Sequence, residues 1–209
     1  MEPRCLIVAP LYDGEERALM TPQEGDLLIC ADGGYQAALA HGLHPHLTIG
    51  DFDSLGYVPQ QGEGIQLPVA KDDTDMAVCI AEGRRRGYRD FVAAGCLGGR
   101  FDHTLSCLQC AADCALRGEH LWLCDARNRV TVLAPGTYEI PRLPGRKLSL
   151  LAYTETVEGV TLTGTAWELQ QASLTNRRPL GCSNEWTADA AQLTFAHGLM
   201  TLCLSGDQA

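Results

Sequence analysis

The sequence predicts two domains of different classes. Residues 1–126 are expected to form an α/β domain, with a mostly parallel sheet and helices on both faces, and residues 127–209 an all-β sandwich or barrel. As far as Cys124, apolar strand-like runs alternate with helical stripes, which is the pattern of a parallel βα sheet. After about residue 126 no long helical pattern follows, and short β-like runs are separated by glycine and proline.

The strands and helices of the first domain follow from this alternation. Residues 11–25 are polar and punctuated by proline, which indicates a loop with a short helix. Each predicted helix ends at a glycine (Gly42, Gly87 or Gly118), a residue favoured just after a helix. The predicted strands are 5–9, 27–31, 47–50, 65–70, 90–96 and 121–124, and the predicted helices are 34–41, 74–86 and 102–117.

The second domain is predicted from short runs alone. Prolines and glycines, such as Pro135-Gly136, Pro141 and Gly181, read as separators between strands. The expected strands are residues 130–133, 147–153, 160–162, 174–175, 193–195 and 199–204.

Composition excludes several classes of protein. With 45% hydrophobic and 20% charged residues, the 209-residue chain has enough apolar material for a proper core. Its net charge of −10 argues against broad binding to nucleic-acid phosphates. No apolar run reaches the ~20 residues that span a bilayer, and the first residues lack a signal-peptide cleavage pattern. We therefore expect a cytoplasmic protein with neither nucleic acid nor membrane as partner.

Ten cysteines are expected to be reduced thiols, most of them in apolar runs. Cys107, Cys110 and Cys114 share one helical face, which suggests either a metal triplet or simple packing. Packing is favoured, because three ligands on one rigid helix face converge poorly on a single metal and free cysteine is commonly buried.

The most informative stretch is Ile49-Gly50-Asp51-Phe52-Asp53-Ser54, where an apolar run ends in two carboxylates. Alternate residues of an extended segment point the same way, so Asp51 and Asp53 are expected to face one cavity and Phe52 the core. Paired carboxylates suit magnesium, which takes oxygen ligands and commonly binds one or two protein carboxylates plus phosphates. The alternative is a polar turn that caps a helix.

Three further polar clusters also follow predicted strands. In an open α/β sheet the carboxyl ends of the strands share one edge, where ligands bind, so four unrelated turns are a poor explanation. The clusters are Asp32-Gly33-Gly34, Lys71-Asp72-Asp73-Thr74-Asp75 and Gly98-Gly99-Arg100-Phe101-Asp102-His103.

These clusters favour a polyphosphate ligand. Gly98 and Gly99 let the backbone approach phosphate oxygens at a helix N-terminus, and Arg100 offers a forked donor. A plain tight turn is the alternative for the glycines. Lys71 either neutralises a phosphate or is merely exposed. Magnesium on Asp51, Asp53 and Asp75, beside this turn, predicts a magnesium- and nucleotide-dependent transferase or hydrolase.

Taken in order, these four motifs resemble the thiamine pyrophosphokinase (thiamine diphosphokinase) family. The Gly-Asp-Phe-Asp-Ser motif with the Asp-x-Thr-Asp motif is the specific part. In the second half, residues 162–169 (Leu-Thr-Gly-Thr-Ala-Trp-Glu-Leu) and 181–185 (Gly-Cys-Ser-Asn-Glu) resemble the thiamine-binding β-domain of that family. The resemblance covers nearly the whole chain.

The resemblance implies transfer of a pyrophosphoryl group from ATP to the hydroxyl of thiamine, giving thiamine diphosphate and AMP. It implies a homodimer with active sites between subunits, Mg²⁺ on Asp51, Asp53 and Asp75, and catalytic roles for these acids, Asp73 and Arg100. The implied nucleotide-binding residues are Asp32, Gly33, Lys71, Asp72, Asp73, Thr74, Gly98, Gly99, Arg100, Asp102 and His103.

Thiamine binding is implied for Ser183 and Asn184. Trp186 or Trp167 is the expected stacking partner of the cationic rings, with Trp167 expected to be the more structural of the two. The proton acceptor stays open between Asp73 and a magnesium-dependent route. The competing functions are a magnesium-dependent nucleotide phosphohydrolase and a non-catalytic sensor.

Overall fold

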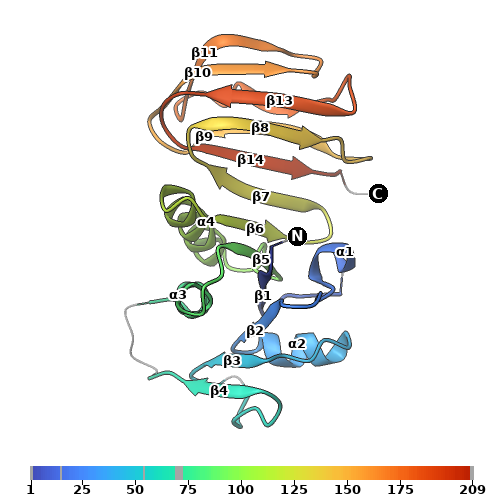
Figure 1. Cartoon of the computed structure of the whole chain (residues 1–209), viewed down its shortest axis with the longest axis vertical. Helices are drawn as coiled ribbons and strands as arrows, with labels where there is room; N and C mark the ends of the chain where they lie inside the picture. Colours follow the sequence, from blue (N-terminus) through green and yellow to red (C-terminus); the bar gives the residue numbers. More distant parts are fainter. Residues whose placement is uncertain (1, 15, 54, 69–72, 208–209) are drawn as a thin grey trace. The chain divides into compact units, whose positions relative to one another are not determined.

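The structure is a computed structural model that describes residues 2–14, 16–53, 55–68 and 73–207 (Figure 1). The chain divides into two compact units, Met1–Ala126 and Arg127–Ala209. Lys71 and Asp72, which the sequence assigns to the nucleotide, lie outside the described residues, as does Ser54.

The N-terminal unit has a sheet of parallel strands in the order β6-β5-β1-β2-β3-β4. This confirms the predicted mostly parallel sheet. Its elements in chain order are β1 (Arg4–Val8), α1 (Arg17–Met20), β2 (Leu27–Ala31), α2 (Gly34–Ala40), β3 (Leu47–Gly50), β4 (Glu63–Gln66), α3 (Asp75–Arg85), β5 (Asp90–Ala94), α4 (Phe101–Leu116) and β6 (His120–Cys124).

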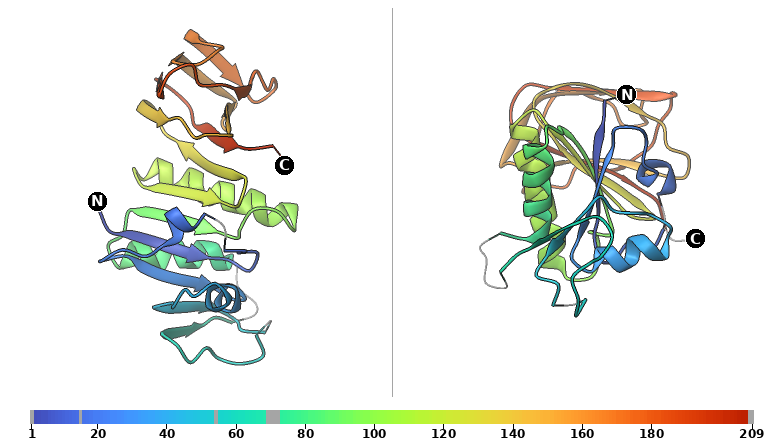
Figure 2. Two further views of the ribbon diagram at one scale, coloured as in Figure 1. Left: turned by 90° about the vertical axis from the view of Figure 1, so that its right-hand side faces the viewer. Right: turned by 60° about the horizontal axis from the view of Figure 1, so that its bottom comes forward.

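The strand order reverses at β1. Strands β2 to β4 extend the sheet on one side of β1, and β5 and β6 extend it on the other. Crossovers between parallel strands are right-handed, so building in both directions puts the connecting helices on opposite faces. Helices α1 and α2 accordingly cover one face, and α3 and α4 the other (Figures 1 and 2). Such a reversal leaves a crevice at the carboxyl ends of the two central strands, here β1 and β5.

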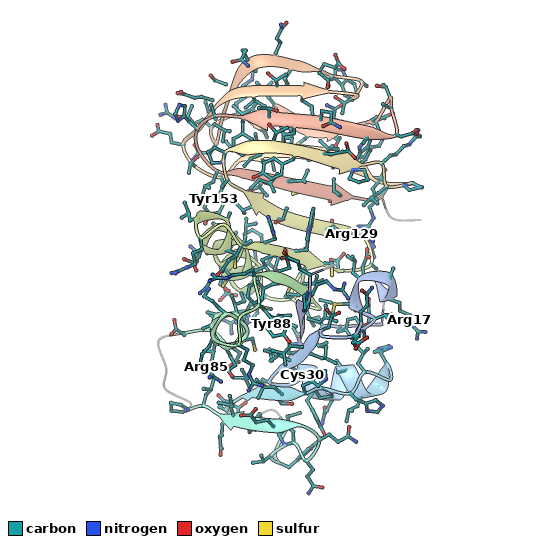
Figure 3. The ribbon with its side chains drawn as sticks, in the orientation of Figure 1. Arg17, Cys30, Arg85, Tyr88, Arg129 and Tyr153 are labelled. Atoms are coloured by element: carbon teal, nitrogen blue, oxygen red, sulfur yellow. The ribbon has the colours of Figure 1, made fainter. Side chains whose placement is uncertain are left out.

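Both faces of this sheet are apolar, as a strand buried on two sides requires. On the α1–α2 face, Leu6, Leu28 and Val92 pack with Phe52 and Tyr35. Figure 3 shows Cys30 of β2 between Arg17 on the α1 side and Arg85 on the α3 side. Phe52 is 4% exposed, which confirms that it points into the core between the two flanking aspartates.

The C-terminal unit consists of two antiparallel sheets, in the orders β7-β14-β9-β12 and β8-β13-β10-β11. Leu148, Leu150 and Leu202 from one sheet and Val160 and Leu193 from the other are buried, as expected of a sandwich core. The strands are β7 (Asn128–Leu133), β8 (Gly136–Pro141), β9 (Lys147–Ala152), β10 (Thr156–Thr163), β11 (Leu169–Thr175), β12 (Gly181–Asn184), β13 (Ala190–Phe195) and β14 (Met200–Ser205).

The sequence missed two strands of this sandwich. Gly136 and Pro141, read as separators, begin and end β8, and Gly181 begins β12. Each of these strands lies at the edge of its sheet, where glycine and proline are tolerated because one side makes no ladder hydrogen bonds. The prediction of a β-sandwich is confirmed.

Burial of most cysteines is also confirmed. Cys107 and Cys114 are buried on α4, and Cys110 between them is half-buried. Burial raises the pKa of Cys110 to about 11 and that of Cys114 to about 12. These neutral thiols support packing over the metal triplet.

Candidate active site

Three carboxylates meet where β2 and β3 end. Asp32, Asp51 and Asp53 each offer an oxygen, and these oxygens lie within 4.8 Å of one another. Asp32 follows β2, and the other two follow β3, its parallel neighbour. Among the described residues, these three side chains form the group of acidic, histidine or cysteine residues that lies close enough together to share one cation.

The backbone holds this acidic cluster in an uncommon conformation. Asp32 and Phe52 have φ angles of 43° and 60°, in the left-handed region that side chains other than glycine seldom adopt. A Cβ on Gly50 would lie 2.8 Å from Asp32 Cβ, so only glycine lets the end of β3 approach this aspartate so closely. The buried Phe52 ring and the Asp32 N–H, which donates to the Ile49 carbonyl at 2.8 Å, hold the two strand ends together.

A local hydrogen bond joins Asp51 and Asp53, the two aspartates that follow β3. The Asp53 N–H donates to Asp51 Oδ1 at 3.2 Å, so the two carboxylates share one turn. Asp51 is half-buried and Asp53 is exposed. Their convergence agrees with the prediction that both face one place.

A cavity of about 470 Å³ lies at the strand reversal. Its lining comes from the segments after β1, β2 and β5 and from the first turns of α3 and α4, as expected of a ligand crevice in an open α/β sheet. The lining residues are Ala9, Pro10, Leu11, Ala31, Asp32, Thr74, Asp75, Met76, Gly95, Cys96, Gly98, Gly99, Arg100, His103, Ser106 and Cys107. Asp32 therefore belongs both to this cavity and to the acidic cluster.

The glycine turn forms one wall of the cavity. Gly98 and Gly99 have φ angles of 83° and 64°, which side chains rarely adopt, and both are exposed. The turn leads into α4, whose first N–H groups have no backbone acceptor within the helix; that of His103 donates to Asp102 Oδ1 at 3.0 Å. The Arg100 side chain makes no capping hydrogen bond there. This is the geometry of an anion-binding helix N-terminus.

The close carboxylate group and the metal set predicted from the sequence share two residues, Asp51 and Asp53. Asp75 lines the cavity with Asp32, but it is not part of the close carboxylate group. It stands in the first turn of α3, which Thr74 caps by accepting a hydrogen bond from the Ala77 N–H at 3.3 Å. Asp32, assigned from the sequence to the nucleotide, occupies the third position of the acidic cluster.

Three of the predicted nucleotide residues that the structure describes do not line this cavity, namely Gly33, Asp73 and Asp102. Asp102 is exposed and pairs with Arg100 at 2.6 Å, and its hydrogen bonds with that arginine lower its pKa. Asp73 lines a neighbouring cavity of about 330 Å³ between α3 and α4, together with Arg84 and Asp113. The two cavities share Thr74 and Ser106.

The two candidate tryptophans of the C-terminal unit differ in exposure in the opposite sense to the one expected. Trp186 is 7% exposed, and its Nε1–H donates to the Ile140 carbonyl at 3.0 Å. A ring buried in this way cannot stack on a ligand, which contradicts the substrate role predicted for Trp186. Trp167 is 63% exposed and borders a small cavity of about 70 Å³ with Leu180 and Cys182.

Asn184 fixes the position of this exposed tryptophan. Its side-chain Oδ1 accepts the Trp167 N–H at 3.1 Å, and its Nδ2 donates to the Trp167 carbonyl at 2.8 Å and to Thr165 Oγ1 at 3.2 Å. Since Asn184 is 6% exposed, it acts on the loop and does not present its amide to solvent. The neighbouring Ser183 is exposed, with a φ of 62°.

Comparison with known families and structures agrees with this geometry. The family model of the thiamin pyrophosphokinase catalytic domain matches residues 21–123, and that of the thiamin pyrophosphokinase vitamin B1 binding domain matches residues 137–200. The chain belongs to the thiamin pyrophosphokinase family. The recognition made from the four motifs is therefore confirmed.

Individual relatives span nearly the whole chain. A thiamine pyrophosphokinase of Bacillus subtilis is 26% identical over 193 residues, covering 88% of this chain and 89% of the relative. The crystal structure of thiamine pyrophosphokinase from Bacillus subtilis has a TM-score of 0.89 at 25% identity, covering 98% of this chain and 100% of that chain. A thiamin pyrophosphokinase family protein from Enterococcus faecalis has a TM-score of 0.82 at 28% identity, covering 99% and 100%.

Proposed function

We propose that this protein transfers the pyrophosphoryl group of ATP to the hydroxyl of thiamine, giving thiamine diphosphate and AMP. Its family is one of ATP-dependent diphosphotransferases. The observation that carries the proposal is a carboxylate cluster beside a cavity walled by a glycine turn, at the strand reversal of a parallel sheet. That arrangement suits a metal-complexed polyphosphate.

Magnesium fits the donor set. The three close carboxylates supply only oxygen, the ligand that Mg²⁺ prefers, and three negative charges this close call for a cation. We propose that Asp32, Asp51 and Asp53 hold it, with Asp75 facing the same nucleotide from α3. When bound, the metal neutralises phosphate charge and orients the polyphosphate.

The chain's own groups would direct the attack to the β-phosphorus. The Gly98–Gly99 turn, the α4 N-terminus and Arg100 would hold phosphate oxygens, which fixes the nucleotide for in-line transfer. A bond from the thiamine oxygen to the β-phosphorus forms, and the bond from that phosphorus to the oxygen bridging the α-phosphorus breaks, so AMP leaves. Asp75 replaces Asp73 as the proposed proton acceptor, because Asp73 lines the neighbouring cavity.

For thiamine we propose Trp167 as the aromatic partner of the cationic rings. It is the exposed tryptophan of the C-terminal unit, and a positive ring over an indole face is favourable. Ser183 of β12 is exposed and stays a proposed thiamine contact. Asn184, the next residue, is proposed to position the Trp167 loop.

We further propose a homodimer in the cytoplasm. Phe101 and Leu116 of α4 are 73% and 71% exposed, and apolar side chains so exposed suit burial against a second copy. All ten cysteines, each within the described part of the chain, are free thiols, which suits a reducing compartment. No helix in the described ranges is long and apolar enough to span a membrane.

The decisive assay mixes the purified protein with ATP, Mg²⁺ and thiamine and separates the products by chromatography. Equal amounts of thiamine diphosphate and AMP are expected. Thiamine monophosphate with ADP would place the attack on the γ-phosphorus and contradict the proposed reaction. Nucleotide hydrolysis at the same rate with and without thiamine would favour a phosphohydrolase instead. Light scattering should give about twice the chain mass of 22.6 kDa.

A further inference from the structure

Two cysteines lie in the wall of the cavity at the strand reversal. Cys96 follows β5 and precedes the Gly98–Gly99 turn, and Cys107 lies in the second turn of α4. They are 7% and 5% exposed, so the cavity is their route to small solutes. Neither residue has a part in the proposed transfer reaction.

The two thiols line the same cavity, and a side-chain hydrogen bond between them contributes to the pKa of each. Cys96 Sγ also donates to the Ala93 carbonyl at 3.6 Å. A third thiol, Cys124 in β6, donates to the same carbonyl at 3.5 Å, but it is buried and does not line the cavity. The cavity is therefore lined by two thiols from two different elements, Cys96 and Cys107.

The two members of the pair differ in acidity. The hydrogen bond from Cys96, with a smaller contribution from the Ser106 hydroxyl, lowers the pKa of Cys107, whereas Cys96 has its pKa raised by this contact and by burial. Cys110, one turn further along α4, lines the neighbouring cavity, and burial raises its pKa to about 11. These directions make Cys107 the more readily ionised member of the pair and so the expected nucleophile, because the thiolate is the attacking form.

We propose that Cys96 and Cys107 form a reversible dithiol–disulfide site in the nucleotide cavity, oxidised by hydrogen peroxide. The Cys107 thiolate attacks one peroxide oxygen, the O–O bond breaks, and hydroxide leaves as Cys107 becomes a sulfenic acid; the hydroxide takes up the proton that the Cys107 thiol had released and becomes water. The Cys96 sulfur then attacks Cys107, the S–S bond forms, and the S–O bond breaks to release a second water. A dithiol reductant reverses the change by thiol–disulfide exchange.

The disulfide would tie the glycine turn to α4. Cys96 is two residues before Gly98, so drawing its sulfur to Cys107 shifts the turn that is proposed to hold phosphate. Oxidation is therefore expected to abolish pyrophosphoryl transfer, and reduction to restore it. This consequence rests on the proposed function, whereas formation of the disulfide does not.

Peptide mapping of the full-length protein after peroxide treatment tests the pairing. A Cys182→Ser background removes the exposed thiol of the C-terminal unit, which would otherwise link molecules. Trypsin cuts after Arg89, Arg100, Arg117 and Arg127, so Cys96 and Cys107 fall in different peptides. We expect these two peptides to be joined with the loss of two hydrogen atoms and to separate on treatment with dithiothreitol.

Single variants identify the partner, since Cys107, Cys110 and Cys114 share one tryptic peptide. Cys107→Ser should abolish the cross-link, and Cys110→Ser, the matched control on the same helix, should keep both the cross-link and the basal activity. A cross-link from Cys96 to the Cys124 peptide, one that survives Cys107→Ser, or no cross-link in the parent protein would each overturn the proposal. The map of the Cys182→Ser background carries no substitution at either thiol of the pair, so it does not depend on the folding of a variant changed at a buried cysteine.

Repeating the peroxide treatment in the presence of nucleotide distinguishes a failure of this proposal from a failure of the proposed function. ATP with Mg²⁺ should slow cross-linking and protect activity, because the nucleotide would cover the thiols. If the cross-link forms at an unchanged rate in saturating ATP, the assignment of the cavity to ATP is wrong, and the thiol pair stands.

Discussion

The sequence located side chains well at the ends of the parallel strands in the N-terminal unit, but poorly in the loops of the C-terminal sandwich. In the N-terminal unit, Asp32 after β2 lies close to Asp51 and Asp53 after β3, and it also lines a cavity with the glycine turn after β5. In the C-terminal unit, the two tryptophans differ in exposure in the opposite sense to the one expected: Trp186 is buried and Trp167 is exposed. A parallel sheet has all its carboxyl ends on one edge, so the position of a motif along the chain already gives its place in space. An antiparallel sandwich has no such rule.

Acidic residues at the strand ends give the largest expected effect. Asp32→Asn should lower kcat/KM by about 10²–10³-fold, the usual loss when one preorganised charge-stabilising group is removed. Asp90→Asn is the matched control, since Asp90 begins β5 and so lies at the opposite edge of the same sheet. Steady-state kinetics at several Mg²⁺ concentrations makes the comparison.

The result for Asp32 decides between the two metal sets. If Asp32→Asn keeps normal turnover while Asp75→Asn loses it, the set predicted from the sequence is right and the close carboxylate group is not the metal site. An equal loss in the Asp90 control would attribute the effect to general damage.

Asn184 provides the next largest effect, and it acts on stability. Asn184→Ala removes the buried amide that holds the Trp167 N–H and carbonyl and Thr165 Oγ1, so the free energy of unfolding should fall by about 2–4 kcal/mol. Ser183→Ala changes an exposed hydroxyl in the adjacent position and should stay within about 0.5 kcal/mol. Urea unfolding measures both, and equal effects would show that the amide does not anchor the loop.

The two tryptophans sharpen the comparison directly. Trp186→Phe leaves the Ile140 carbonyl without its donor and should cost about 2 kcal/mol of unfolding free energy. Trp167→Phe should change stability by less than about 0.5 kcal/mol, because its ring is exposed. Trp167→Ala should instead raise the KM for thiamine by about tenfold, within the range of a cation–π contact, and leave the KM for ATP unchanged. The reverse pattern would restore the roles predicted from the sequence.

What the sequence could predict follows from how local each feature is. The sequence predicted that Phe52 points into the core and its flanking aspartates away from it, but the reason was different: the three residues follow β3 in a turn, where Phe52 has a left-handed φ of 60°. That Asp32 joins the close carboxylate group was not readable, since it depends on the left-handed φ of Asp32 and on the missing Cβ of Gly50. The burial of Trp186 depends on pairing with Ile140, 46 residues away, and no local pattern encodes that contact. The signal that did exist for Asp32 was its position after the strand next to β3.

The smallest expected effect tests whether acid sensitivity belongs to the N-terminal unit. At the end of α3, hydrogen bonds from Arg85, reinforced by Arg86, lower the pKa of Glu82 from 4.5 to about 2. A carboxyl whose pKa is lower in the folded state stabilises the fold above its unfolded pKa and loses that contribution as the pH falls toward the folded value. The contribution is therefore complete above about pH 4.5 and vanishes near pH 2.

Glu82→Gln should accordingly lower the unfolding free energy at pH 7 by about 0.5–1 kcal/mol, the range for ion pairs near the surface. At about pH 2 the variant and the parent should be equally stable. Glu24→Gln, at an exposed position of the same unit, is the control, and its unfolding free energy should stay within about 0.5 kcal/mol of the parent's at pH 7. Urea titrations at a series of pH values supply the data. A gap between Glu82→Gln and the parent that is constant from pH 7 to pH 2 would mean that Glu82 contributes through packing alone, and that the charge pairs of α3 do not set the acid limit of this unit.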